Sequence, residues 1–178
     1  MANIGFRKVQ VASLTAGVYG TPATVGKAIS MSVTPNYTEA SLYGDDILAE
    51  YEKAFVDADI TLGTTYIPAA VQAVMFGHTV ATDEVTSKAD DDPGYCGLGA
   101  IAQVVKDGTK TFEAIFFPKV KFSEPEGSYE TKGDSVTYNT PSFSGKALAD
   151  ETTKIWRVVK GGFADEATAQ TWLTSQFS

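Results

Sequence analysis

Residues 32–46 read SVTPNYTEASLYGDD and join a turn, an alternating pattern and an abrupt acidic end in one short segment. The overlapping residues 28–34 alternate apolar and polar side chains, which is typical of a half-buried strand. The Pro-Asn pair at 35–36 predicts a turn, and residues 37–43 continue the period of two. We therefore predict a hairpin of these two strands, followed by a long exposed loop over residues 44–53, where four acids occur without clear periodicity.

The charge of the chain changes sign at the same place. Residues 1–37 carry three cations and no acid, whereas residues 38–59 carry seven acids and one lysine. Two unlike ends on one molecule favour head-to-tail contact between identical copies. A solvated acidic loop is the ordinary interpretation of such a block, and both interpretations stay open at this point.

The composition describes one domain over residues 1–178, long enough to bury a core without a metal or a disulfide. The single cysteine, Cys96, excludes an internal disulfide and is expected to be a small buried hydrophobe. A formal net charge of −8 disfavours tight binding of nucleic acid. No apolar run approaches the ~20 residues of a membrane span, and the first residues lack a secretory pattern, so we expect no membrane insertion and synthesis in the cytosol.

Plentiful valine, threonine, tyrosine and phenylalanine favour strands separated by turns. Two stretches instead have helical spacing, residues 68–76 and 165–176. The clearest hairpin joins residues 95–105 to 110–122, because the Asp-Gly pair between them favours a tight primed turn, and Pro118 should then lie at a bulge or an edge. Further strands are predicted over residues 6–14, 54–62, 80–85, 135–147 and 154–159.

These elements predict a mainly β fold with flanking α structure. The expected architecture is a β-sandwich or partly open barrel with one internal helix and one C-terminal helix. Residues 1–27 would form an N-terminal arm and the first strand, and residues 147–178 a C-terminal strand and helix.

Motifs for chemistry are weak. His78, the only histidine, follows a predicted helix end and has no sequence neighbour suited to activate a nucleophile. Residues 97–102, GLGAIA, match a dinucleotide pattern in form, but they lie in a hairpin arm, so small residues that let a neighbouring strand or subunit approach are the better interpretation. Residues 20–27 fail the spacing of a phosphate loop, and the acids at 57–59 and 90–92 lack the register of a calcium loop. We expect no enzyme activity and no catalytic, cofactor-binding or metal-binding residues.

Side chains that suit contact between subunits gather around the acidic segment. Tyr37, Tyr43, Tyr51 and Phe55 are aromatic, and exposed aromatic side chains are typical anchors of interfaces. In the strand predicted over residues 54–62, Asp57, Asp59 and Thr61 share one face. That face would look either into solvent or into the channel of an oligomer.

The chain resembles the major tail tube proteins of long non-contractile-tailed phages (siphophages). Residues 32–36 and 40–46, SVTPN and ASLYGDD, look like the opening hairpin of that family and its LY-small-DD loop, and residues 68–78, PAAVQAVMFGH, look like its helix that closes on Gly-His. Residues 117–126, with Tyr-Glu-Thr-Lys-Gly-Asp at 129–134 and Thr-Pro at 140–141, are similar to its second half. The resemblance covers roughly residues 5–146.

This resemblance implies a structural virion protein of phage tail-tube type. It would polymerise with itself as stacked hexameric rings into the conduit for DNA ejection, with transient, non-specific passage of DNA. Its other partners would be tape measure, tail-terminator and baseplate proteins, and it would reside in the virion tail after assembly in the host cytoplasm. The implied contacts between subunits or rings are Tyr43, Asp45, Asp46, Glu50 and Tyr51; the implied lumen-facing residues are Asp57, Asp59 and Thr61.

A different class of function remains open. The chain would then be a monomeric β-sandwich module for adhesion or ligand binding, and it would form no ring or tube. An enzyme is the third candidate, and a small-molecule pocket near His78 would be its simplest support.

Overall fold

The computed structural model describes residues 2–44, 47–82, 84–106, 108–127, 131 and 140–178. Strand makes up 58% and helix 12%, so the fold is mainly β with two helices, as expected. The strands are β1 (Ala2–Thr15), β2 (Val18–Tyr19), β3 (Ala23–Thr24), β4 (Ala28–Gly44), β5 (Ile47–Thr64), β6 (Thr79–Ala81), β7 (Glu84–Thr86), β8 (Cys96–Lys106), β9 (Thr109–Phe122), β10 (Ser142–Leu148) and β11 (Val158–Phe163). The helices are α1 (Ala69–Phe76) and α2 (Glu166–Ser175).

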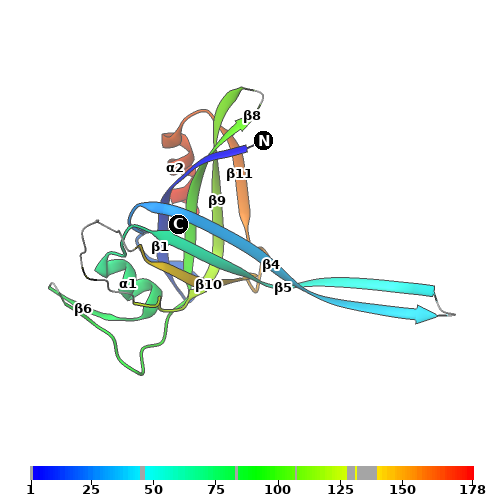
Figure 1. Cartoon of the computed structure of the whole chain (residues 1–178), viewed down its shortest axis with the longest axis horizontal. Coiled ribbons are helices and arrows are strands. Elements are labelled where there is room, and N and C mark those ends of the chain that lie inside the picture. Colours follow the sequence, from blue (N-terminus) through cyan, green and yellow to red (C-terminus); the bar gives the residue numbers. More distant parts are fainter. Residues whose placement is uncertain (1, 45–46, 83, 107, 128–130, 132–139) are drawn as a thin grey trace.

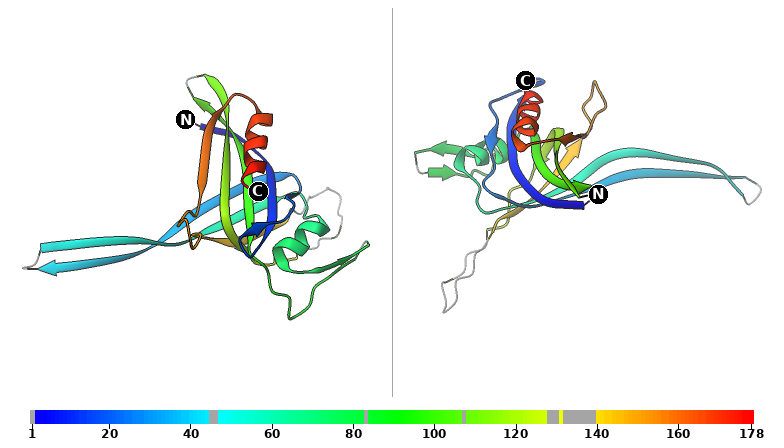
Figure 2. Two further views of the ribbon diagram at one scale, coloured as in Figure 1. Left: turned by 180° about the vertical axis from the view of Figure 1, so that it is seen from behind. Right: turned by 90° about the horizontal axis from the view of Figure 1, so that it is seen from above.

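One curved antiparallel sheet organises the molecule (Figures 1 and 2). Its strand order is β2-β1-β8-β9-β10-β5-β4, with β11 paired to β9 and β3 paired to β1, while β6 and β7 form a separate small hairpin. Such open, bent sheets agree with the β-sandwich that the sequence predicts.

The sheet carries a hydrophobic core on each face. Neighbouring residues of a strand point to opposite faces. In β9, Phe117 belongs to a larger core with Ile60, while Phe116 belongs to a smaller core with Leu173. Cys96 is buried in the larger core as expected, and burial raises the pKa of its thiol to about 12.

Each helix covers one of these cores. Helix α1 ends at Gly77 as predicted and contributes Val71 and Met75 to the larger core. Helix α2 is capped at its N-terminus by Asp165, whose side chain accepts a hydrogen bond from the Thr168 backbone N–H at 2.7 Å. Helix α2 then packs Leu173 into the smaller core.

The glycines of residues 97–102 accommodate this second helix. A Cβ at Gly99 would lie 2.7 Å from Leu173 Cδ1, so the missing side chain is what lets α2 approach β8. At Gly99 the neighbour is therefore a helix of the same chain. At Gly97 a Cβ would lie 2.7 Å from Cε1 of Tyr19 in β2, so the expectation of a neighbouring strand holds there. A dinucleotide site is also excluded here, because β8 continues as a strand where that motif requires a helix.

The hairpin of β8 and β9 agrees with the sequence-based prediction. Strand β8 ends at Lys106 and β9 begins at Thr109, and Gly108 between them has a φ of +79°. The register of β9 against β8 shifts between Cys96 and Leu98, opposite Pro118. At the same place the neighbour on the other side of β9 changes from β11 to β10. Pro118 therefore lies at a bulge, as predicted.

Four expectations about strands are corrected. Residues 28–44 form the single strand β4 instead of two strands joined at Pro35, because an edge strand tolerates the missing N–H of proline. The first strand, β1, spans residues 2–15 instead of the predicted 6–14. Residues 79–81 and 84–86 form the two paired strands β6 and β7 in place of one edge strand. The closing strands occupy 142–148 and 158–163, while residues 135–139 of the predicted segment lie outside the described residues.

Within the described residues, neither helix has the length and apolar composition that crossing a membrane requires.

Candidate functional site

The most distinctive surface is the outer half of the β4–β5 hairpin, residues 37–44 and 47–55, which we call the projecting hairpin. It extends far from the body of the molecule (Figures 1 and 2). Nearly all of its side chains whose burial is described are exposed, the exception being the half-buried Phe55. Beyond Ala58, β5 has no described neighbour except β4, and no described strand pairs with the outer edge of β4. Both edges of the projecting hairpin therefore present unpaired backbone groups.

One face of the projecting hairpin, the aromatic face, is neutral overall. Cross-strand pairing places Tyr37 opposite Phe55, Glu39 opposite Lys53, and Ser41 opposite Tyr51. Lys53 Nζ lies 2.8 Å from Glu39 Oε1 and 4.5 Å from the centroid of the Tyr37 ring. This ion pair lowers the pKa of Glu39 and raises that of Lys53. The aromatic face thus combines large apolar surface with balanced charge.

The opposite face, the acidic face, carries unbalanced charge. Thr38, Ala40 and Leu42 pair there with Ala54, Glu52 and Glu50, respectively. Neither glutamate has an ion-pair partner among the described residues, and Leu42, directly opposite Glu50, is 60% exposed. A face of this composition suits a partner that is both basic and apolar.

The base of the projecting hairpin is fixed by aromatic stacking. Phe55 stacks on Trp156 with 4.8 Å between ring centroids, and it meets the edge of Tyr37 at 6.0 Å. The register of β4 against β5 shifts between Asn36 and Tyr37, so β5 has a bulge at Val56. The bulge turns the side chain of Phe55 toward the larger core. The alternation of the strand predicted over residues 54–62 therefore breaks at Val56, which is exposed.

The acidic segment is mostly strand, so the predicted loop over residues 44–53 is also wrong. Residues 47–53 belong to β5, and Glu50 and Tyr51 are exposed on opposite faces of the projecting hairpin. Tyr43 lies near the end of β4. Asp45 and Asp46 lie outside the described residues. The structure therefore places three of the five candidate contact residues on one projecting element.

The three candidate lumen residues form a polar cluster on β5. Asp57, Asp59 and Thr61 share the face opposite the larger core, as the sequence predicts. Asn36 Nδ2 donates to both carboxylates at 2.7 Å, and Lys146 Nζ lies 3.0 Å from Asp57 and 3.1 Å from Asp59. The hydrogen bonds from Asn36, and then those from Lys146, lower the pKa of both aspartates. Two carboxylates thus share one cation.

Replacing this cation gives a testable change in stability. Because the aspartate pKa values are lowered in the folded state, the stabilisation is present above the ordinary carboxylate pKa and disappears as pH falls through the lowered values. We expect Lys146→Met to unfold more readily than the parent chain in urea at pH 7, with a smaller difference at pH 2. Lys88→Met, at a lysine without a described ion pair, is the control. An equal difference at both pH values would contradict the assignment.

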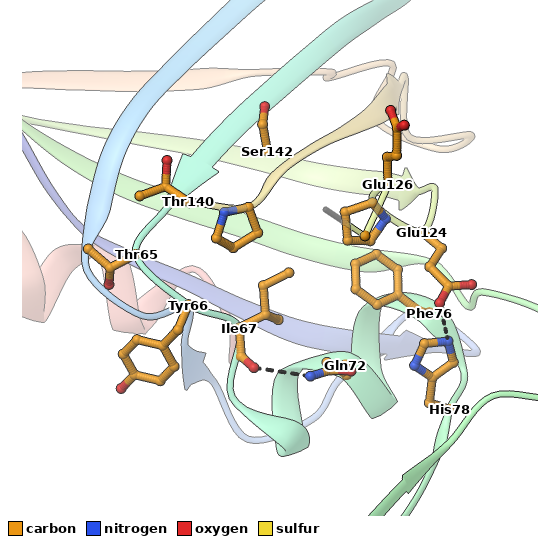
Figure 3. A pocket seen from close by; sticks show the side chains of 13 residues that line it. Thr65, Tyr66, Ile67, Gln72, Phe76, His78, Glu124, Glu126, Thr140 and Ser142 are labelled. Carbon is orange, nitrogen blue, oxygen red and sulfur yellow. Dashed lines mark hydrogen bonds and ion pairs between the residues drawn. The ribbon is translucent and has the colours of Figure 1, made fainter. Parts of the chain in front are cut away.

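A groove of about 920 Å³ lies beside α1 (Figure 3). Tyr66, Phe76 and His78 line one side of it, and Glu124 and Glu126 come from the segment after β9. The sequence analysis considered His78 as the possible base of an enzyme, and the structure shows this histidine buried at the groove.

The contacts of His78 do not form a catalytic triad. Its Nε2 lies 3.2 Å from Ser87 Oγ and 3.6 Å from Glu124 Oε1, while its buried Nδ1 has no partner among the described residues. In a triad the serine and the acid contact different nitrogens of the ring, so that the acid orients the base. Here both groups meet the same nitrogen, so the groove suits binding better than acyl transfer.

Two contributors to these surfaces were missed from the sequence. Lys146 reaches the aspartates only because β10 pairs with β5, and Trp156 reaches Phe55 from a separate loop. No local sequence pattern predicts either contact. In the described part of the chain, no group of three or more His, Cys, Asp or Glu side chains is arranged to hold a metal.

Comparison of the chain with models of protein families and with curated proteins finds no match. The functional argument therefore rests on the geometry above and on the resemblance of the motifs.

Proposed function

We propose that this protein is a structural subunit that polymerises as stacked hexameric rings into a phage tail tube, the conduit for DNA ejection. The projecting hairpin is the observation that carries this proposal. Tape measure, tail-terminator and baseplate proteins are the further partners that the resemblance implies. The tube would be a virion component assembled in the host cytoplasm.

The hairpin supports assembly because it is poorly stabilised in one copy alone. An isolated two-stranded hairpin is marginal in water, and no described strand pairs with either edge of this one. Its exposed side chains include Tyr37 at 44%, Leu42 at 60% and Tyr51 at 52%. Contact with neighbouring copies would bury these side chains and pair the edges, and repetition of one such contact builds rings and filaments.

The polar face of the sheet supports the role of a channel wall. Ser32, Thr34 and Ser144 are exposed neighbours of the Asp57–Asp59 cluster, in register with Thr61 and Asp59. This face carries hydroxyl groups and a cluster whose two aspartates and one lysine leave one excess negative charge. Such a face has no array of cations that could replace the counterions of DNA. A lumen lined by this face would let DNA slide without adhering.

Charge reversal at the tip of the hairpin tests the proposal. We expect the double variant Asp45→Lys and Asp46→Lys to remain folded but to form fewer and shorter tubes, because the tip would contact the adjacent ring. Tube length by electron microscopy is the readout, with the unfolding temperature as the control for folding. Tubes of unchanged number and length would count against this role of the tip.

The groove beside His78 favours a second candidate, a monomeric module that binds a ligand. In that case the purified protein would stay monomeric, and a bound ligand would perturb the side chains around Phe76. The oligomeric state separates the two candidates directly.

A further inference from the structure

We infer that the acidic face of the projecting hairpin docks on the edge of β11 in the next copy of the chain. This inference rests on the proposed function and names the surface that receives the hairpin. The receiving surface, which we call the basic edge, consists of Lys154, Ile155, Arg157, Val159 and Lys160.

The basic edge carries positive charge, which complements the negative charge of the acidic face. Residues 152–163 contain three cations and no acid. Lys154, Arg157 and Lys160 are exposed, and none has an ion-pair partner among the residues that the structure describes. Their attraction to Glu50 and Glu52 would be long-range and would guide the orientation of the two copies.

The acids nearest to the basic edge leave this charge largely uncancelled. Asp150 accepts hydrogen bonds from the backbone N–H of Thr153 at 2.7 Å, and Glu151 pairs with Lys119 at 2.7 Å. The Glu113 carboxylate borders Gly161, 3.6 Å from where a Cβ would stand there. The Glu113 carboxylate beside three cations leaves the basic edge with a net positive charge.

The basic edge also offers apolar surface and an unpaired backbone. Ile155 is 42% exposed and Val159 is 46% exposed, and they could contact the exposed Leu42, which lies opposite Glu50 on the acidic face. Strand β11 pairs with β9 on one side, and no described strand pairs with its other side. A hairpin laid along that side would satisfy backbone groups as well as charges.

The hairpin of the same copy does not make this contact. Trp156 holds the base of the hairpin through Phe55, which lies on the aromatic face, whereas Glu50 lies on the opposite face. Glu50 is also five residues farther out, on the order of 16 Å at ~3.3 Å per residue. Since a stiff paired strand does not fold back over that distance, the contact requires a second copy.

Reversal of charge on each side tests the pairing. We expect Glu50→Lys with Glu52→Lys, and separately Arg157→Glu with Lys160→Glu, each to reduce assembly of the purified protein at least tenfold. An equimolar mixture of the two variants should assemble again, because each reversed surface then meets its complement. The single chain with all four changes should assemble as well, and assembly of the parent chain should weaken with salt.

Glu84→Lys and Lys88→Glu, on or beside the small β6–β7 hairpin, are matched controls for charge reversal and should leave assembly unchanged. If only the Glu50→Lys, Glu52→Lys variant lost assembly, the basic edge would not be the docking surface. The same would follow if both variants lost assembly and their mixture did not recover it. Either result would leave the proposed function standing. A parent chain that remains monomeric would instead contradict the proposed function itself.

Discussion

Replacement of residues 38–54 by Asn-Gly is expected to give a folded monomer that no longer assembles. The replacement joins Tyr37 to Phe55, which face each other across the hairpin, through the pair of residues favoured in a two-residue primed turn. The described side chains that are removed are all exposed, so no core contact is lost. A shorter connection also costs less chain entropy to close.

The measurement is the solution mass by light scattering, together with urea unfolding of both chains. We expect the truncated chain to stay monomeric at concentrations where the parent assembles, and its free energy of unfolding to be unchanged or slightly higher. Replacement of the small β6–β7 turn, residues 82–83, by Asn-Gly is the matched control. Assembly of the truncated chain into tubes would show that the hairpin is dispensable.

Phe143→Ala should cause the largest loss of stability among single substitutions at the described core of β10. Phe143 is buried and makes edge contacts with Phe76 of α1 and Phe122 of β9, at 6.0 and 5.5 Å between ring centroids. Removal of a buried phenylalanine side chain costs about 3–5 kcal/mol through lost burial and the cavity that remains.

Urea unfolding at pH 7 measures this loss. Tyr66→Ala is the control, because the tyrosine lies on the same side of the molecule as α1 but is 58% exposed, and we expect a change within about 0.5 kcal/mol. A loss below about 1 kcal/mol for Phe143→Ala would mean that the joint between β10, β9 and α1 is less closely packed than described here.

Elements with local signals could be predicted from the sequence. The spacing of Val71 and Met75 with a glycine after them locates α1, and the Asp-Gly pair locates the turn between β8 and β9. Alternation locates the inner half of β5, where Ile60 and Leu62 are buried. In each case one face is buried, so the chemical pattern and the structural period coincide.

The outer half of the hairpin could not be predicted in this way. Residues 47–53 are a strand, and those of them whose burial is described, residues 50–53, are exposed on both faces. No burial imposes a period of two there. Pro35 also suggested a turn, although an edge strand accommodates it. The contacts of Lys146 and Trp156 depend on which strands become neighbours, which no local pattern reveals.

The central claim is that identical copies of this chain assemble head to tail through the projecting hairpin. Negative-stain electron microscopy of the purified protein across a concentration series, beside a light-scattering mass, tests it most directly. We predict rings and hollow tubes whose proportion rises with concentration. A particle that keeps the 18.9 kDa mass of one chain at every concentration would contradict the claim.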